Sequence, residues 1–214
     1  MFKALDLFCC AGGASEGLRR AGFEVTGVDI RPQPHYCGDT FVQADALEFP
    51  LEGYDLIWAS PPCQAFTAYK RRPSHVAPCQ NLIPAVRERL AGLPALTIIE
   101  NVPGAPLRRN LMLCGSMFDL SVRRHRLFEL SFEAIQPTCR HQDQAPRFPP
   151  ASNRHSLRRT VEVGVWRIPL EVQRAAMGID WMTREELSQA IPPAYSEHIG
   201  RCAMAALDHR PGPP

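Results

Sequence analysis

The sequence lacks several features that mark particular classes of protein. Among its 214 residues no apolar run approaches the roughly 18 residues that a membrane span needs, so we expect no membrane association. The first residues lack the basic and apolar regions of a secretory signal, and we therefore expect a cytoplasmic protein. No Gly-Lys-Ser/Thr follows the glycine-rich stretch near the N-terminus, which excludes a phosphate-binding P-loop.

The cysteines do not complete a recognisable metal-binding pattern. The chain has eight of them, and in a reducing cytoplasm they are thiols rather than disulfides. Cys139 and His141, and likewise His35 and Cys37, have a spacing that suits a pair of metal ligands. No second CxxC or HxxxH pair completes a set of four, so we expect no metal site.

The formal net charge is only +2, but the basic residues are unevenly spread. They cluster at residues 70–72, 108–109, 123–126 and 154–159. Local basic clusters on a nearly neutral chain favour an anionic partner such as nucleic acid. A solvated surface explains any one of these clusters equally well.

Short apolar runs alternate with helical patterns along most of the chain. Strands are predicted at residues 4–8, 23–30, 41–46, 54–60, 96–102 and 124–130, and helices at residues 16–22, 84–91, 169–177, 184–190 and 193–209. Ser15 is a candidate N-cap and Gly22 a stop for the first helix, and Thr183 and Glu186 have capping-box spacing. This alternation predicts an α/β fold, a doubly wound parallel sheet with helices on both faces.

Residues 131–163 interrupt the pattern. This segment is polar, basic and rich in proline, and it has no helical or strand period. We read it as either a small recognition module or a surface excursion, which leaves residues 1–130 and 164–214 as the main domain. Residues 210–214 read as a disordered tail.

Chemically suggestive residues follow several predicted strands. Gly12 and Gly13 follow the first, Asp29 closes the second and Asp45 the third. Ligands of doubly wound folds bind at these strand ends, where an acidic residue can accept hydrogen bonds from ribose hydroxyls. The pattern favours a nucleoside cofactor without a phosphate chain, although a glycine-rich turn can also be only a turn.

The fourth and fifth predicted strands end at Cys63 and at Glu100. A thiol and a carboxyl that face one cleft can act as a nucleophile and a proton donor. Considered alone, Cys63 is better read as a small buried residue. Trp58 and Trp181 are read as core residues rather than as platforms for base stacking.

Five motifs stand in the order of those of the C5-cytosine DNA methyltransferases: DLFCCAGG, PPCQ, ENV, RRHRLF and RIPLEVQRAAMGIDWM…IPPAYSEHIG. The chain resembles this family, and its compact form resembles the small phage-type members. The resemblance omits chiefly residues 131–163, which are few for a target-recognition domain. It implies a Rossmann-like methyltransferase sheet, S-adenosylmethionine as cofactor, and a bacterial cell or phage-infected host as the location.

The resemblance also assigns residues to roles. It implies catalytic roles for Cys63, as the nucleophile at C6 of cytosine, Glu100, at N3 and the amine, and Arg124 and Arg126, next to the base. It implies cofactor contacts from Phe8, Gly12, Gly13, Asp29, Ile30, Asp45, Ala46 and Pro61. The candidates for nucleic-acid contact are Gln64, Lys70, Arg71, Arg72, Arg154, Arg158 and Arg159.

The function implied is methyl transfer to C5 of a flipped cytosine in double-stranded DNA, through a covalent Cys63 adduct. We expect a monomer on DNA, with sequence readout that is short, relaxed or dependent on an accessory partner. The short recognition segment keeps RNA or a free cytosine nucleotide open as substrates. A catalytically silent nucleic-acid-binding module, or transfer of a modified group, also stays open.

Overall fold

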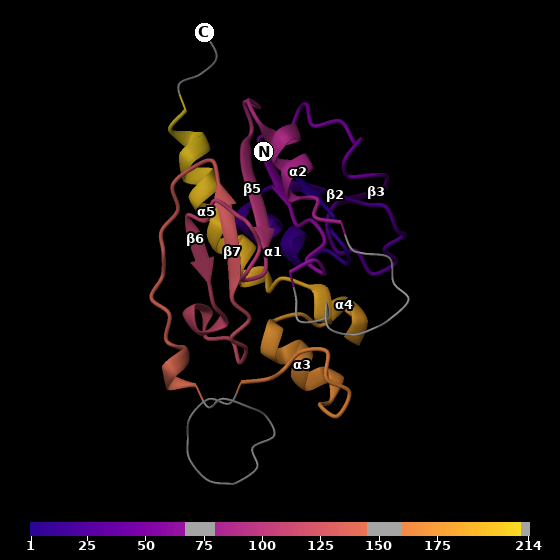
Figure 1. Ribbon diagram of the computed structural model, residues 1–214, viewed down its shortest axis with the longest axis vertical. Coiled ribbons are helices and arrows are strands. Elements are labelled where there is room, and N and C mark those ends of the chain that lie inside the picture. Colours follow the sequence, from indigo (N-terminus) through magenta and orange to yellow (C-terminus); the bar gives the residue numbers. More distant parts are fainter. Residues whose placement is uncertain (67–79, 145–159, 211–214) are drawn as a thin grey trace.

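The computed structural model describes residues 1–66, 80–144 and 160–210, and a seven-stranded sheet forms its centre (Figure 1). The strand order is β3-β2-β1-β4-β5-β7-β6. The strands are β1 (Lys3–Leu7), β2 (Glu24–Asp29), β3 (Thr40–Gln43), β4 (Leu56–Ala59), β5 (Leu96–Asn101), β6 (Leu111–Leu113) and β7 (Arg126–Leu130). The helices are α1 (Gly13–Ala21), α2 (Ile83–Leu90), α3 (Leu170–Met177), α4 (Arg184–Gln189) and α5 (Pro193–Asp208).

The sheet is mixed, and the prediction of a wholly parallel sheet was wrong at one edge. Strands β3, β2, β1, β4 and β5 pair in parallel, whereas β7 pairs antiparallel with both β5 and β6. A parallel connection needs a crossover of a dozen or more residues. Between β6 and β7 the chain has only a short 3-10 turn, Gly115–Phe118, so it returns antiparallel. The three-residue β6 was not predicted.

Helices cover both faces of the sheet, as predicted. Leu18 of α1 and Tyr195 of α5 pack in one core together with Trp58, which is fully buried. Val86 of α2 packs in a second core on the other face, against residues such as Ile57. Alternate residues of β4 therefore contribute to the two cores, which explains why its sequence is apolar throughout.

Helices α1 and α5 approach closely. A side chain at Gly17 would collide with the Pro193 carbonyl oxygen and the Ser196 hydroxyl.

Helix α1 begins two residues before Ser15, with Gly12 as its N-cap residue, so the prediction of a Ser15 cap was wrong. The Ser15 hydroxyl instead donates to the buried Asp6 carboxylate at 2.6 Å. Gly22 ends the helix as predicted.

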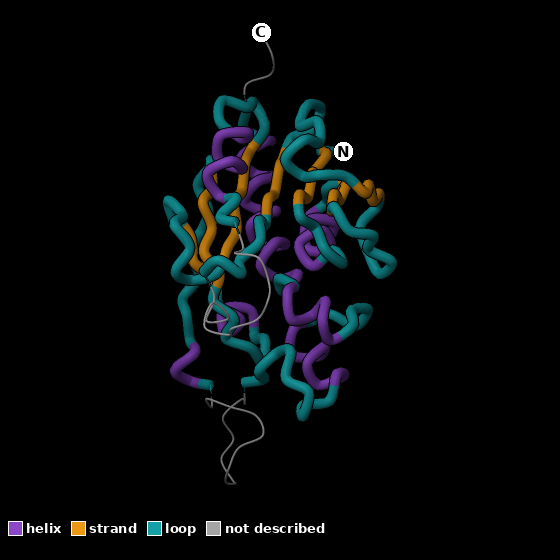
Figure 2. The backbone as a smooth tube through the Cα atoms, turned by 45° about the vertical axis from the view of Figure 1, so that its right-hand side comes forward, coloured by secondary structure: helices purple, strands orange, loops and turns teal. Residues whose placement is uncertain are grey.

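The C-terminal part of the chain confirms the predicted helix signals. Thr183 and Glu186 form the reciprocal capping box of α4, and Gly178 ends α3 in the left-handed conformation. In Figures 1 and 2, α3 and α4 lie beyond one end of the strands. Among the described residues no helix has the length and apolarity to cross a membrane.

Residues 131–163 are described only at their two ends, as residues 131–144 and 160–163. The first part runs beside β6, where the Gln136 side chain hydrogen-bonds both the amide and the carbonyl of Met112. It ends in a 3-10 turn, His141–Asp143. Of the predicted tail, Arg210 donates to the Pro94 carbonyl at 2.6 Å, and residues 211–214 lie outside the described part.

Candidate functional site

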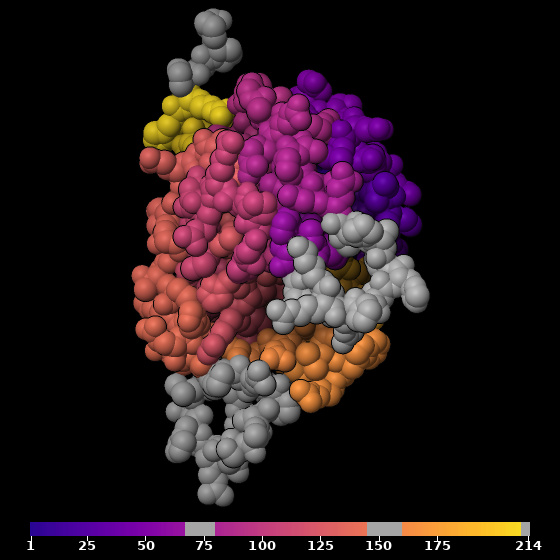
Figure 3. All heavy atoms as spheres, viewed as in Figure 1, coloured from indigo at the N-terminus to yellow at the C-terminus, as the bar shows by residue number. Residues whose placement is uncertain are grey.

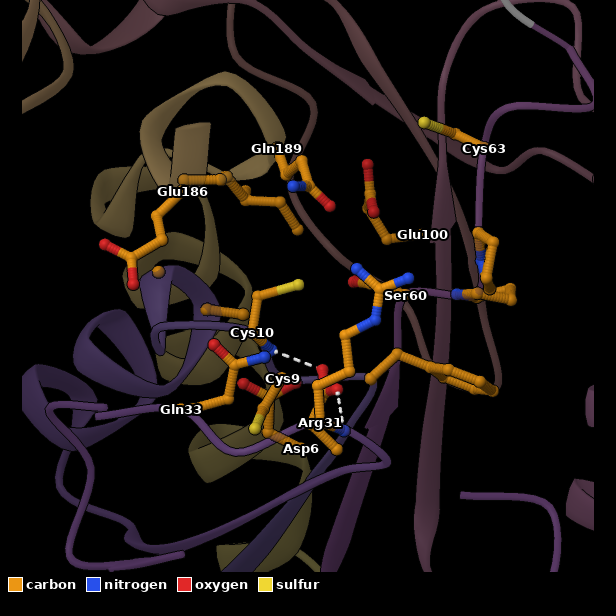
Figure 4. A pocket seen from close by; sticks show the side chains of 18 of the residues that line it. Asp6, Cys9, Cys10, Arg31, Gln33, Ser60, Cys63, Glu100, Glu186 and Gln189 are labelled. Carbon is orange, nitrogen blue, oxygen red and sulfur yellow. Dashed lines mark hydrogen bonds between the residues drawn. The ribbon is translucent and has the colours of Figure 1, made fainter. Parts of the chain in front are cut away.

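A cavity of about 420 Å³ lies where the ends of β1, β2, β4 and β5 face α4. Pockets for small ligands usually measure about 300–1,000 Å³, so this one suits a cofactor or a single base. The space-filling view is hollowed between the indigo-to-magenta part of the chain and the orange helices (Figure 3). Figure 4 shows the cavity from close by, with Cys63 and Glu100 on one side and Cys10 and Gln33 on the other.

The loop after β1 turns sharply at one end of this cavity. Phe8, Cys10 and Gly12 alternate in the left-handed region, with φ of 62°, 46° and 84°. Such angles are costly for residues other than glycine, and strain of this kind concentrates at functional sites. The φ of 46° at Cys10 is one that glycine adopts at less cost than cysteine.

Asp29 holds the loops after β1 and β2 together. One carboxylate oxygen accepts from the Cys10 amide and the other from the Arg31 amide, both at 3.0 Å (Figure 4). A carboxylate has about four acceptor positions, so each oxygen keeps a lone pair for another donor. Asp29 lines the cavity, and its position suits the predicted role of accepting from two ribose hydroxyls.

The two glycines are required by the protein itself. A Cβ at Gly13 would lie 2.6 Å from the Ile191 carbonyl oxygen, and one at Gly12 would lie 2.9 Å from the Cys37 sulfur. Gly13 also lines the cavity. The glycines therefore allow this loop to pack closely against the beginning of α5 and against the segment after β2.

Asp6 is a lining residue that the sequence reasoning missed. One of its oxygens accepts from Ser15, while the other is buried and has no hydrogen-bond partner among the described residues. Burial raises the pKa of Asp6 to about 7, against the lowering effect of Ser15. An unsatisfied buried acceptor in the cavity wall fits a ligand with cationic or N–H groups. The sequence signal that could have identified Asp6 is a carboxylate inside an otherwise apolar predicted strand.

Three predicted cofactor residues do not line this cavity: Gly12, Asp45 and Ala46. Asp45 is exposed, and its carboxylate accepts from the Leu47 amide at 2.8 Å, so it caps a turn. Ala46 is buried in the core below α2, where its carbonyl accepts from Arg89. The other predicted cofactor residues Phe8, Ile30 and Pro61 line the cavity, and so do Cys63, Gln64, Glu100 and Arg126.

The loop that carries Cys63 is fixed from the neighbouring strand. The Asn101 side chain donates to the Pro61 carbonyl at 2.9 Å, and its oxygen accepts from the Val102 amide. The two prolines fix their own φ angles, so little freedom is left before the half-buried thiol. The ends of β4 and β5 thereby hold Cys63 at the wall of the cavity.

Glu100 and Arg126 form an ion pair inside the cavity wall. The Arg126 Nε lies 3.1 Å from a Glu100 carboxylate oxygen, and the two side chains are only 13% and 7% exposed. Burial raises the pKa of Glu100, while Arg126 and a hydrogen bond from Ser60 oppose the rise. Ser60 is itself held by the Trp58 indole, which donates to its oxygen at 2.8 Å.

The same charges act on the thiol. Burial raises the pKa of Cys63, the positive charge of Arg126 lowers it, and the negative charge of Glu100 raises it. The site therefore couples the protonation of a thiol to that of a carboxyl through one arginine. This is an arrangement that can hold a nucleophile beside a proton donor.

Arg124 does not line the cavity. Its guanidinium donates to the carbonyls of Ala190 and Ser188 at 2.9 and 2.6 Å, at the end of α4. Its own carbonyl accepts from Tyr195, and its φ of 33° is left-handed. Burial, then the nearby Arg126, lowers the pKa of Arg124 to about 9. Its contacts position the chain before β7 against α4.

Several other residues line the cavity although no sequence pattern identified them as site residues. Arg31 and Gln33 follow β2, and Glu185, Glu186 and Gln189 come from α4. Figure 4 shows Arg31 and Gln33 on the side of the cavity opposite Cys63. The remaining predicted contacts to nucleic acid lie outside the described residues: Lys70, Arg71, Arg72, Arg154, Arg158 and Arg159.

The sequence spacing did not predict that four potential metal ligands lie together in the structure. Cys139 and His141 lie together with Cys114 and His125, although no sequence spacing pairs them. The other candidate pair separates, since Cys37 donates to the Gly12 carbonyl and His35 pairs with Glu186.

Comparisons with known proteins identify relatives of this chain. No family model matches it. The type II methyltransferase M.HgiGI of Herpetosiphon aurantiacus is 30% identical over 120 residues, which cover 50% of this chain and 95% of that protein. M.AgeI of Thalassovita gelatinovora is 30% identical over 120 residues, covering 48% of this chain but only 28% of M.AgeI. The matched part thus spans far less than two thirds of that larger relative.

Solved structures share the fold. A candidate DNA modification methyltransferase encoded within an E. coli prophage superposes with a TM-score of 0.66, at 14% identity, over 98% of this chain and 100% of that chain. The DNMT2 of Spodoptera frugiperda gives a TM-score of 0.63 at 12% identity, over 95% and 100%. At these identities the likeness establishes the fold. The 30% identity to M.HgiGI over 95% of that protein shows that the chain belongs to the family of type II methyltransferases, which is consistent with the resemblance of its motifs to the C5-cytosine DNA methyltransferases.

Proposed function

We propose that this protein transfers a methyl group from S-adenosylmethionine to C5 of cytosine in DNA, through a covalent bond between Cys63 and C6. The observation that carries the proposal is the single cavity in which Cys63 lies with the Glu100–Arg126 ion pair, next to the Asp29 loop. The chain's membership of a methyltransferase family supports the reaction class.

The cofactor side of the cavity suits S-adenosylmethionine. When bound, this cofactor supplies an electrophilic methyl group on a sulfonium. Asp29 keeps lone pairs for the ribose hydroxyls, and the unsatisfied Asp6 oxygen offers an acceptor to a cationic group. Phe8 and Gly13 also line this cavity.

The residues around Cys63 suit attack on a cytosine ring. The Cys63 thiolate forms a bond to C6 while N3 takes a proton from Glu100, a role that the rise of the Glu100 pKa on burial favours. Arg126 favours the thiolate and stabilises negative charge that develops near the base. C5 of the resulting enamine then takes the methyl group as its bond to the sulfonium breaks, which leaves a neutral thioether. Loss of the C5 proton to solvent and of the N3 proton to Glu100 releases the Cys63 sulfur from C6.

The substrate must be a base outside its stack. C5 and C6 are not accessible to a side chain within a duplex, so the target cytosine has to be flipped into the cavity. We assign the choice of target to residues 131–163, acting on double-stranded DNA as a monomer or with an accessory partner. Residues 1–130 and 164–214 form the catalytic domain in this proposal.

RNA is the second candidate substrate. The 23S rRNA (uracil(747)-C(5))-methyltransferase of Pyrococcus horikoshii is 32% identical over 80 residues, which cover 33% of this chain and 19% of that protein. Addition of a thiolate at C6 activates C5 of either pyrimidine, so Cys63 would serve as the nucleophile on both. The few residues between β7 and α3 also favour a substrate whose bases are already unstacked.

Trapping the adduct tests the proposal. The protein is incubated with labelled S-adenosylmethionine and DNA or RNA that contains 5-fluorocytosine, because fluorine at C5 cannot leave as a proton does. We expect a covalent adduct that carries the label, is absent in Cys63→Ser, and persists in the control Cys202→Ser, a substitution in α5 away from the cavity. A folded protein that binds the cofactor but forms no adduct with either polymer would overturn the proposal.

A further inference from the structure

Four potential metal ligands lie together outside the cavity: Cys114, His125, Cys139 and His141. One ligand atom from each lies within 4.8 Å of all the others. The Cys139 sulfur is 2.9 Å from the His141 Nδ1 and 3.8 Å from the His125 Nε2. The two imidazole rings are 5.1 Å apart and nearly perpendicular, at 81°.

The four residues come from three separate parts of the fold. Cys114 follows β6, His125 immediately precedes β7, and Cys139 and His141 belong to the segment that leaves β7. Pairing of β6 with β7 places Leu113 opposite Arg126, which brings Cys114 next to His125. Gln136, bonded to Met112, then directs the returning segment to the same end of the hairpin.

We propose that these two cysteines and two histidines bind a zinc ion in tetrahedral geometry. Two thiolates and two imidazoles are a donor set that zinc prefers in structural sites. Zinc–sulfur bonds of about 2.3 Å and zinc–nitrogen bonds of about 2.0 Å require ligand atoms about 3.3–3.8 Å apart. The distances in the cluster lie on both sides of this range, so shifts of about 1 Å complete the tetrahedron.

A hydrogen-bonding group outside the ligands supports the assignment. The Ser116 hydroxyl donates to the Cys114 sulfur at 3.2 Å and lies 3.5 Å from the Cys139 sulfur. It also accepts from the Arg140 amide at 3.0 Å. Hydrogen bonds to ligating sulfurs are typical of built metal sites, where they orient the ligands. The Arg123 guanidinium donates to the His141 carbonyl and so holds this ligand's backbone beside the chain that leads to β7.

The zinc would connect the recognition segment to the active site. His125 stands between Arg124, which contacts α4, and Arg126, which pairs with Glu100. Cys139 and His141 lie close to the start of residues 145–159. A bound metal would therefore fix the backbone that carries both arginines and anchor the described part of the recognition segment at Cys139 and His141.

Cobalt substitution of the whole protein tests this inference. The untagged chain is purified in reducing buffer, its zinc is measured, and the metal is then exchanged for cobalt(II). We expect one zinc per chain to survive dialysis. Cobalt should give the visible bands of a tetrahedral site and a thiolate charge-transfer band. Cys114→Ser and Cys139→Ser should each weaken the charge-transfer band, while Cys202→Ser should leave it unchanged.

Two further measurements keep the test decisive if a variant fails to fold. The titration of wild-type protein with cobalt needs no substitution, and circular dichroism reports whether the chain is folded. A folded wild-type chain that binds neither zinc nor cobalt tetrahedrally would overturn the inference. So would a Cys114–Cys139 disulfide detected by mass spectrometry after alkylation without reductant. These outcomes are independent of methyl transfer, so they leave the proposed function untouched.

Discussion

Replacing Arg126 by methionine isolates the ion pair on which the proposed chemistry depends. Two unit charges about 4 Å apart interact by about 4 kcal/mol at an effective dielectric constant of about 20. Breaking a buried pair by removing one partner costs about 3–5 kcal/mol. Because the Arg126 and Glu100 side chains are 13% and 7% exposed, we expect Arg126→Met to lower the free energy of unfolding by about 3 kcal/mol when Glu100 is ionised.

The cost should depend on pH in a defined direction. The pKa of Glu100 is already raised in the folded state, and Arg126 is the largest influence that lowers it. Without Arg126 this pKa rises further, and the folded variant holds its proton to higher pH. At a pH where Glu100 is protonated in both proteins, little is lost. As the pH rises from the folded pKa of the wild type to that of the variant, the destabilisation should grow to its full value.

Urea unfolding of both proteins at about pH 5 and about pH 8.5 measures this difference. Glu100→Gln supplies the matched background, since glutamine keeps the shape and cannot ionise. In that background Arg126→Met should cost less than about 1 kcal/mol and should not depend on pH. A cost in the wild-type background that is the same at both pH values would refute the reasoning, as would one below about 0.5 kcal/mol at the higher pH.

Two other results are expected. Gly17→Ala should destabilise by about 3 kcal/mol in urea unfolding, because its methyl group meets the Pro193 carbonyl and the Ser196 hydroxyl. The control Gly53→Ala places a methyl group that meets no atom within 4 Å, at a φ of 85°. It should lower the free energy of unfolding by only about 1 kcal/mol. Equal losses for the two variants would contradict the packing argument. The rate of Cys63 alkylation, corrected with Cys63→Ser, should rise at a pH above that of an ordinary thiol. Arg126→Met should move that midpoint to still higher pH, and an unchanged midpoint would show that Arg126 does not act on the thiol.

Local signals predicted the elements that depend on local physics. Gly22, Gly178 and the capping pair of Thr183 and Glu186 end or begin helices where the sequence places them. The reversal of β7 could not be found in this way. Strand direction depends on what connects the strands, and a short apolar run reads identically in either direction.

The site was predicted in part, and the reason differs for each residue. Cys63, Glu100 and Asp29 end strands, so topology alone brings them to one cavity. Asp45 also follows a strand, but β3 lies at the edge of the sheet, where its carboxylate caps a turn instead. The metal cluster was missed because Cys114 and His125 meet only through the antiparallel pairing of β6 with β7.

The packing of α5 on α1 has a consequence for how the chain is made. Leu18 lies in α1, yet its core partners Tyr195, Ile199 and Leu207 belong to α5, which is synthesised much later. Since translation releases the N-terminal residues first, that apolar face stays uncovered until α5 has left the ribosome. The cofactor loop depends on the same late event, because Gly13 packs against Ile191. The nascent chain therefore completes its cofactor site only after α5 has been synthesised. Until then its uncovered apolar face is available to chaperones.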